Sequence, residues 1–161
     1  MAPHDQMPDE ACRGPSQRPQ VLVIEDEVVI AMMLEQILVE AGYDVIMAFS
    51  GEEALVTAAS LDRMALVVTD IGLTYGIDGR SVLRELRAKT PHLPAVVVTG
   101  FGEWRHEADL RGLGGPTARL LKPFGTEELM TSIQTVLAAR AKSMEEPARL
   151  NRVDDRRGPS R

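Results

Sequence analysis

Five polar residues stand at or just after the ends of short apolar segments and could act together in one site: Glu25, Asp26, Asp70, Thr99 and Lys122. Three carboxylates held close together repel one another strongly unless a cation neutralises them. Mg²⁺ suits such an all-oxygen site, because it keeps several waters and bridges carboxylates to phosphate oxygens. The sequence has no cluster of histidine or cysteine that would indicate zinc. These residue types therefore favour phosphate chemistry assisted by Mg²⁺, for which Mn²⁺ could substitute.

The apolar segments in front of these residues have the pattern of strands that are buried on both faces. They occupy residues 21–24, 45–49, 65–69, 94–98 and 118–121. Helical patterns separate them, and five strands alternating with five helices imply right-handed crossovers and a doubly wound parallel sheet. Ligands of such sheets bind beyond the carboxyl ends of the strands, which is where the five polar residues lie.

Capping residues mark the starts of several expected helices. Ser50 and Glu53 have the spacing of a capping box, and Asp78 and Thr126 can act as N-caps. The last helix is expected to carry its apolar face as far as residue 137. The weakest expected helix covers 103–112, because its apolar face is thin and glycines crowd its end.

Length and composition indicate one globular domain with polar ends. The 161 residues are 44% hydrophobic and 26% charged, which is an ordinary globular balance. We expect a flexible leader over 1–19, a folded domain over 20–141 and a polar, disordered tail over 142–161. Cys12 is the only cysteine, so no disulfide can form within the chain.

Charge and hydropathy also exclude several classes of partner. A formal net charge of −6 gives the chain no general attraction for nucleic acid or for an anionic membrane. No apolar run is long enough to cross a bilayer, and the start of the chain lacks the pattern of a signal peptide. We therefore expect a cytoplasmic protein that binds neither nucleic acid nor membrane.

Five motifs occur in an order that resembles the receiver domain of bacterial response regulators. They are VLVIEDE, VVTDIGL, DGRSVLREL, VVVTGFG and LLKPF, and the resemblance covers about residues 20 to 140. Each motif is weak alone, but the ordered set is specific. The resemblance implies a flavodoxin-like α/β fold with strand order 2-1-3-4-5 and five helices.

The resemblance also implies a role for each candidate residue in the metal site. Glu25, Asp26 and Asp70 would bind the metal together with the backbone carbonyl of Gly72. Asp70 would be the phosphoacceptor. A carboxylate that attacks phosphorus forms a mixed anhydride, which is covalent catalysis by an aspartate.

Two further residues would act on the phosphoryl group. By the resemblance, Thr99 hydrogen-bonds that group and Lys122 pairs with it as a cation. The negative charge of the transferring group makes positioning and electrostatics the main sources of catalysis. The resemblance further implies a cis peptide bond between Lys122 and Pro123, which would aim the lysine into the crevice.

The sequence departs from the common receiver pattern in the loop after the acceptor and in the switch residues. Thr74 stands where the family usually has proline, and a one-residue insertion is expected before Asp78. Arg119 replaces the usual switch aromatic on the fifth strand. We expect Phe101 and the fourth helix to take over the response, in a Thr-Gly-aromatic-Gly motif that includes Gly100 and resembles an alphaproteobacterial single-domain subgroup.

These features predict a single-domain response regulator. A sensor histidine kinase or a histidine phosphotransfer protein would phosphorylate Asp70, and an unknown downstream protein would read the result. The chain could equally serve as a phosphoryl sink or shuttle, with slow autodephosphorylation as its only other catalysis. Two rivals stay open: a phosphorylation-independent interaction module of the same shape, and a phosphatase with an aspartyl nucleophile. The phosphatase usually needs an acid two residues after the nucleophile, where this chain has Gly72.

Overall fold

A single five-stranded parallel sheet forms the centre of the molecule. The computed structural model describes residues 18–61, 63–100, 110 and 112–150, without the side chains of 146–150. The strand order is β2-β1-β3-β4-β5, which confirms the predicted order. The strands are β1 (Gln20–Ile24), β2 (Asp44–Ala48), β3 (Met64–Asp70), β4 (Ala95–Thr99) and β5 (Thr117–Leu121).

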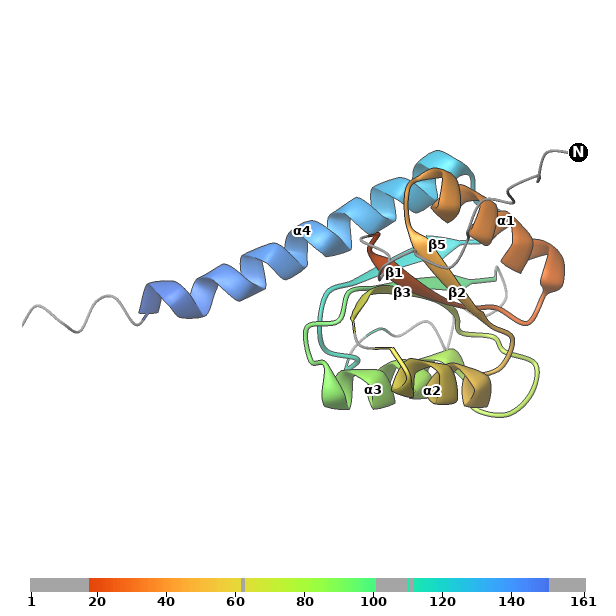
Figure 1. The fold of residues 1–161 in the computed structure, drawn as a ribbon, viewed down its shortest axis with the longest axis horizontal. Coiled ribbons are helices and arrows are strands. Elements are labelled where there is room, and N and C mark those ends of the chain that lie inside the picture. Colours follow the sequence, from red (N-terminus) through yellow and green to blue (C-terminus); the bar gives the residue numbers. More distant parts are fainter. Residues whose placement is uncertain (1–17, 62, 101–109, 111, 151–161) are drawn as a thin grey trace, which may run out of the picture.

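Helices cover both faces of this sheet (Figure 1). They are α1 (Val28–Glu40), α2 (Gly51–Ala59), α3 (Gly79–Lys89) and α4 (Thr126–Leu150). Buried side chains of α1 and α4 share a cluster with one face of the sheet, and those of α2 and α3 share a cluster with the other. The described residues thus contain four helices, and the fifth predicted helix, over 103–112, falls almost entirely outside them.

Alternation along each strand divides the core between the two faces. In β1, Leu22 and Ile24 pack toward α2 and α3, whereas Val21 and Val23 pack toward α1 and α4. Because neighbouring side chains of a strand point to opposite faces, a strand buried on both faces needs a continuous apolar run. This is the physical reason for the apolar segments of the sequence, and it fixes which residues end up at the strand termini.

The predicted capping interactions are present at two helices that flank the site. The Ser50 hydroxyl accepts a hydrogen bond from Glu53 N at 3.1 Å, and Glu53 accepts one from Phe49 N at 2.8 Å. At α3, the carboxylate of Asp78 accepts a hydrogen bond from Ser81 N at 2.9 Å. These caps set where α2 and α3 begin, which is where the loops that follow β2 and β3 end.

The prediction of a disordered tail from residue 142 is wrong over residues 142–150. Helix α4 continues to Leu150 and runs past the sheet (Figure 1). Seven of these nine residues are strong helix formers, and the helix continues despite Pro147, which lacks the N–H that a residue inside a helix donates. Residues 151–161 and 1–17, most of the predicted tail and leader, lie outside the described residues. Among the described helices, none is long and apolar enough to cross a membrane.

A buried arginine that sequence reasoning did not single out ties α3 to the segment before β5. Arg87 is only 5% exposed. Its guanidinium donates hydrogen bonds to the carbonyl oxygens of Leu93 (2.8 Å), Leu113 (3.2 Å), Gly114 and Pro116 (2.7 Å), and to the hydroxyl of Thr117 (2.8 Å). Burial lowers the pKa of Arg87 to about 10, so the group stays charged at neutral pH.

Candidate functional site

The carboxyl ends of the central strands bring the predicted residues together. Asp70 is the last residue of β3 and lies beside Val98 of β4 in the strand register. Thr99 ends β4, and its carbonyl accepts a hydrogen bond from the backbone N–H of Lys122 at 2.9 Å. The parallel register therefore places Thr99, Asp70 and Lys122 at one edge of the sheet, as expected for a doubly wound fold.

Three carboxylates form the acidic part of this site. Glu25, Asp26 and Asp70 each offer an oxygen within 4.8 Å of the others. Glu25 is fully buried, Asp70 is buried and Asp26 is half-buried. Buried carboxylates at this spacing suit a hard divalent cation, because oxygen ligands are the ones that Mg²⁺ prefers. The donor set present therefore fits the predicted magnesium site.

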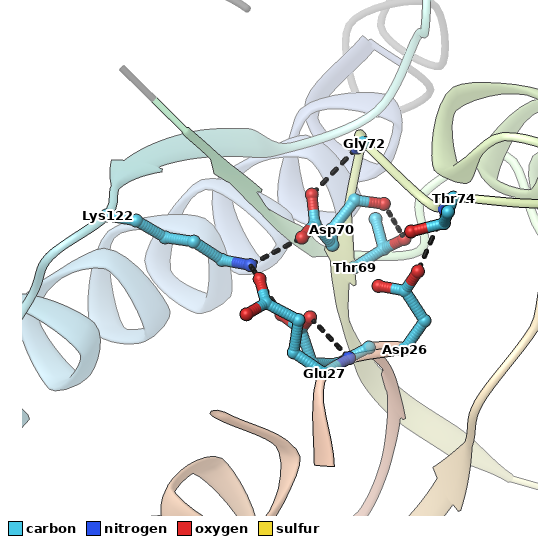
Figure 2. Close-up of polar contacts among 8 residues, drawn as sticks. Asp26, Glu27, Thr69, Asp70, Gly72, Thr74 and Lys122 are labelled. Atoms are coloured by element: carbon cyan, nitrogen blue, oxygen red, sulfur yellow. Dashed lines mark hydrogen bonds and ion pairs between the residues drawn. The ribbon is translucent and has the colours of Figure 1, made fainter. Parts of the chain in front are cut away.

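Lys122 reaches into the acidic group from β5. Its ammonium nitrogen lies 2.5 Å from Asp70 Oδ2, 3.0 Å from Glu25 Oε2 and 3.4 Å from Glu27 Oε1. Figure 2 shows its side chain pointing toward Asp70. The peptide bond between Lys122 and Pro123 is cis, which confirms that prediction. Glu27, which the sequence analysis gave no role, is the third acidic partner of this lysine.

Charge balance shifts the pKa values of two members of the site. Burial raises the pKa of Glu25 to about 7, with Asp70 adding to the rise and Lys122 opposing it. Burial alone would lower the pKa of Lys122, but hydrogen bonds to Asp70 and Glu25 outweigh that effect and raise it above its usual value. The lysine is therefore firmly cationic, as a group that neutralises phosphoryl oxygens must be.

Asp26 is held by the loop that follows β3. Thr74 N donates a hydrogen bond to Asp26 Oδ2 at 2.8 Å, as Figure 2 shows. Partial burial would raise the pKa of Asp26, but hydrogen bonding to Thr74 holds it below its usual value. Asp26 is therefore an anion at neutral pH, which is the state in which a carboxylate binds a metal.

Thr99 brings a buried hydroxyl without a protein partner. The residue is fully buried, and no hydrogen-bond partner of its Oγ1 is present in the part of the chain that the structure describes. An unsatisfied buried hydroxyl costs about 1–3 kcal/mol. Such a group indicates a place for a ligand oxygen, which agrees with the role predicted for Thr99.

The backbone after Asp70 turns sharply beside the carboxylate. Gly72 N donates a hydrogen bond to Asp70 Oδ1 at 2.7 Å. A Cβ atom on Gly79 would lie 1.9 Å from the carbonyl oxygen of Asp70, so only glycine fits at the start of α3. These contacts hold Asp70 from both sides. The metal-ligand role of the Gly72 carbonyl stays a prediction.

The predicted switch residues are only partly described. Gly100 directly follows β4, and Arg119 is exposed on β5. Phe101 lies outside the described residues, as does Cys12. The role of Phe101 and Arg119 in the response therefore stays a prediction.

A family model described as the response regulator receiver domain matches residues 21–134. That range is most of the chain and includes every residue of the site described above. The chain belongs to the response regulator receiver family. The described helices and strands within that range, the acidic group and the lysine are thus those of a receiver domain.

Solved receiver structures share the fold over nearly their whole length. A response regulator receiver domain protein from Clostridium thermocellum is 26% identical, with a TM-score of 0.68 over 77% of this chain and 98% of that one. A response regulator receiver protein from Sinorhizobium medicae WSM419 is 29% identical, with a TM-score of 0.67 and the same two coverages. The shared fold therefore covers about three quarters of this chain and nearly all of each solved receiver.

Curated relatives are longer than this chain. The "Probable transcriptional regulator ycf27" of Porphyra purpurea is 37% identical over 123 residues, which are 76% of this chain and 49% of that protein. The protein of the same name from Cyanophora paradoxa is 36% identical over 73% of this chain and 48% of its own. The chain spans about half the length of these curated relatives. What they share with it is the receiver domain.

Proposed function

We propose that this receiver accepts a phosphoryl group on Asp70, with Mg²⁺ as cofactor, and so carries a signal in a two-component phosphorelay. The observation that carries the proposal is the meeting of Asp70 with Glu25, Asp26 and the ammonium of Lys122 at one sheet edge. The buried hydroxyl of Thr99, which has no hydrogen-bond partner among the described residues, supports it, because a phosphoryl oxygen would satisfy that group.

The chemistry follows from where these atoms lie. A carboxylate oxygen of Asp70 attacks phosphorus, the bond from phosphorus to the donor breaks, and its electron pair leaves with the donor. A bound Mg²⁺ would supply positive charge against the phosphoryl oxygens, held by Glu25, Asp26 and Asp70. The cation of Lys122 balances the charge of the acyl phosphate. The Gly72 N–H and the Lys122 ammonium each bind one oxygen of Asp70 and so fix the orientation of the nucleophile.

The partners follow from the same chemistry. The donor would be a phosphohistidine on a sensor histidine kinase or on a histidine phosphotransfer protein. The phosphorylated surface would bind a downstream protein, or the chain would act as a phosphoryl sink or shuttle. Asp70 phosphorylation and slow hydrolysis of the product would be its only catalysis, and the cytoplasm its location. The TGFG sequence beginning at Thr99 supports membership of the Thr-Gly-aromatic-Gly subgroup.

The test is intact-mass spectrometry after incubation with acetyl phosphate, with and without Mg²⁺. We expect one phosphoryl addition that requires Mg²⁺ and disappears in Asp70→Asn. Asp44→Asn is a matched control, because Asp44 begins β2 at the other end of the sheet. A folded protein that gains no phosphoryl group under any condition would overturn the proposal and favour an interaction module that works without phosphorylation. Continuous release of phosphate from unrelated phosphate esters would instead favour a phosphatase.

A further inference from the structure

The loop between β3 and α3 makes an unusual contact with a predicted metal ligand. Thr74 stands where receivers commonly have proline, and its N–H donates to Asp26 Oδ2 at 2.8 Å. A proline at this position could not make this bond, because it has no N–H. The interaction is therefore a property of this chain's own sequence.

The geometry of the contact leaves Asp26 ready to bind a cation. Oδ2 is the oxygen that accepts the Thr74 N–H, and the other oxygen, Oδ1, is not used in that bond. Groups that hydrogen-bond a metal-ligating side chain without touching the metal fix the orientation of that side chain, and losing them commonly weakens metal affinity by about 10–100-fold. Asp26 is half-buried at the start of a turn, so without such a contact its side chain would have several rotamers open to it.

The loop itself is held at a second point. Ile77 N donates a hydrogen bond to Glu52 Oε1 on α2 at 3.1 Å. Gly76, which lies between Thr74 and Ile77, has φ of +78°. It is so close to Glu52 that a Cβ on Gly76 would fall 2.4 Å from the Glu52 carboxylate. The loop is therefore pinned to α2 on one side of Thr74 and to Asp70 through Gly72 on the other. A pinned loop can hold Asp26 at low entropic cost.

We propose that Thr74 is a positioning residue for the metal site: its N–H binds Oδ2 of Asp26 and so holds the carboxylate with the other oxygen, Oδ1, toward the cation. This inference rests on the proposed Mg²⁺-dependent function. Thr74 itself touches neither the cation nor the phosphoryl group, so it acts only through Asp26.

The first test measures Mg²⁺ affinity by NMR titration of backbone amides. Thr74→Pro removes the N–H that binds Asp26, and we expect the Mg²⁺ Kd to rise about tenfold. Thr74→Val keeps the N–H and should leave the Kd within about twofold of the wild-type value. Tyr75→Ala is the matched control, because Tyr75 is the neighbouring, 84% exposed loop residue, and its Kd should not change. An unchanged Kd in Thr74→Pro would overturn the proposal.

The second test needs no metal and separates this inference from the proposed function. In the metal-free protein, Asp26→Ala should speed amide hydrogen exchange at Thr74 by at least about tenfold, while exchange at Ile77, which is bound by Glu52, stays unchanged. Equal exchange at Thr74 in both proteins would refute the Thr74–Asp26 link itself. Slow exchange at Thr74 in a wild-type protein that binds no Mg²⁺ would confirm the link but overturn the positioning role together with the metal requirement of the proposed function.

Discussion

Arg87, which is buried, and Lys122, which is half-buried, lie at opposite ends of the sheet, and their positive charges are neutralised in different ways. At the carboxyl edge of the sheet, Lys122 is surrounded by the carboxylates of Glu25, Glu27 and Asp70. Away from that edge, Arg87 binds backbone carbonyls and one hydroxyl, and no carboxylate among the described residues is paired with it. The pKa of the lysine is raised, whereas that of the arginine is lowered to about 10.

The kinds of partner that surround a charged side chain indicate whether it stabilises the fold or takes part in chemistry. The partners of Arg87 are mostly backbone carbonyls, and they occupy its N–H donors. Arg87 therefore ties α3 to the segment before β5 and has no N–H left to bind a ligand. The partners of Lys122 are carboxylates in excess over it, so the group retains net negative charge. Excess acid around one lysine is the arrangement that a divalent cation and a phosphoryl group can complete.

The largest expected effect is on stability, at the arginine. Arg87→Met should lower the free energy of unfolding by about 3–5 kcal/mol, because several buried carbonyls lose their donor. The measurement is urea unfolding followed by circular dichroism. Arg84→Met is the matched control, since Arg84 lies one turn earlier on α3 and is exposed. A loss of unfolding free energy below about 1 kcal/mol would show that the hydrogen bonds of Arg87 do not stabilise the fold.

The next effect is on chemistry, at the lysine. Lys122→Ala should slow phosphoryl addition from acetyl phosphate by about 10²–10³-fold, because the cation that balances the acyl phosphate is gone. Initial rates by intact mass give the comparison. Folded Arg87→Met protein should react within about threefold of wild type. A Lys122→Ala rate within about threefold of wild type would remove the chemical role assigned to this lysine.

A smaller effect isolates how tightly the arginine is packed. Gly115 has φ of +60°, and a Cβ there would lie 2.8 Å from Arg87 Nε. Gly115→Ala should therefore cost about 2 kcal/mol of unfolding free energy, from backbone strain plus displacement of Arg87. Gly114→Ala, with φ of +63° and nothing within 4 Å of its Cβ, should cost only about 1 kcal/mol. Equal losses in urea unfolding would mean that the contact with Arg87 adds nothing.

The smallest expected effect separates chemistry from stability within the site. Thr99→Val removes a buried hydroxyl that has no partner among the described residues, so it should leave the free energy of unfolding equal or raise it by up to about 1 kcal/mol. Phosphoryl addition should slow about tenfold for lack of that hydrogen bond. Thr99→Ser should recover most of the rate. A destabilised Thr99→Val protein with a normal rate would make Thr99 an ordinary core residue.

The site could be predicted from the sequence because strand ends and site residues coincide. Apolar segments locate the strands, the parallel register aligns their carboxyl ends, and the polar residues that follow must therefore meet. Arg87 could not be found in the same way, because its partners are backbone carbonyls and leave no mark in the sequence. In the sequence, Arg87 follows Leu86 and resembles the other charged residues of α3, which are expected on its exposed face.

Other parts depended on contacts that pattern alone does not carry. Helix α4 extends to Leu150 although Pro147 lies within it and no apolar stripe marks its end. Thr74 was recognised as a departure from the receiver pattern, but its bond to Asp26 depends on the path of the loop. Glu27 is a partner of Lys122 because the start of α1, which Glu27 precedes, lies beside the lysine. Each of these is a matter of tertiary placement.

The central claim is that Asp70, and no neighbouring carboxylate, carries the phosphoryl group. Borohydride reduces an aspartyl phosphate to homoserine, so reduction after acetyl phosphate treatment marks the acceptor permanently. Peptide mass spectrometry should then find homoserine at position 70, only when Mg²⁺ and the donor were both present. Homoserine at position 26, a reduced glutamyl product at position 25, or no reduced residue in a folded protein would contradict the account.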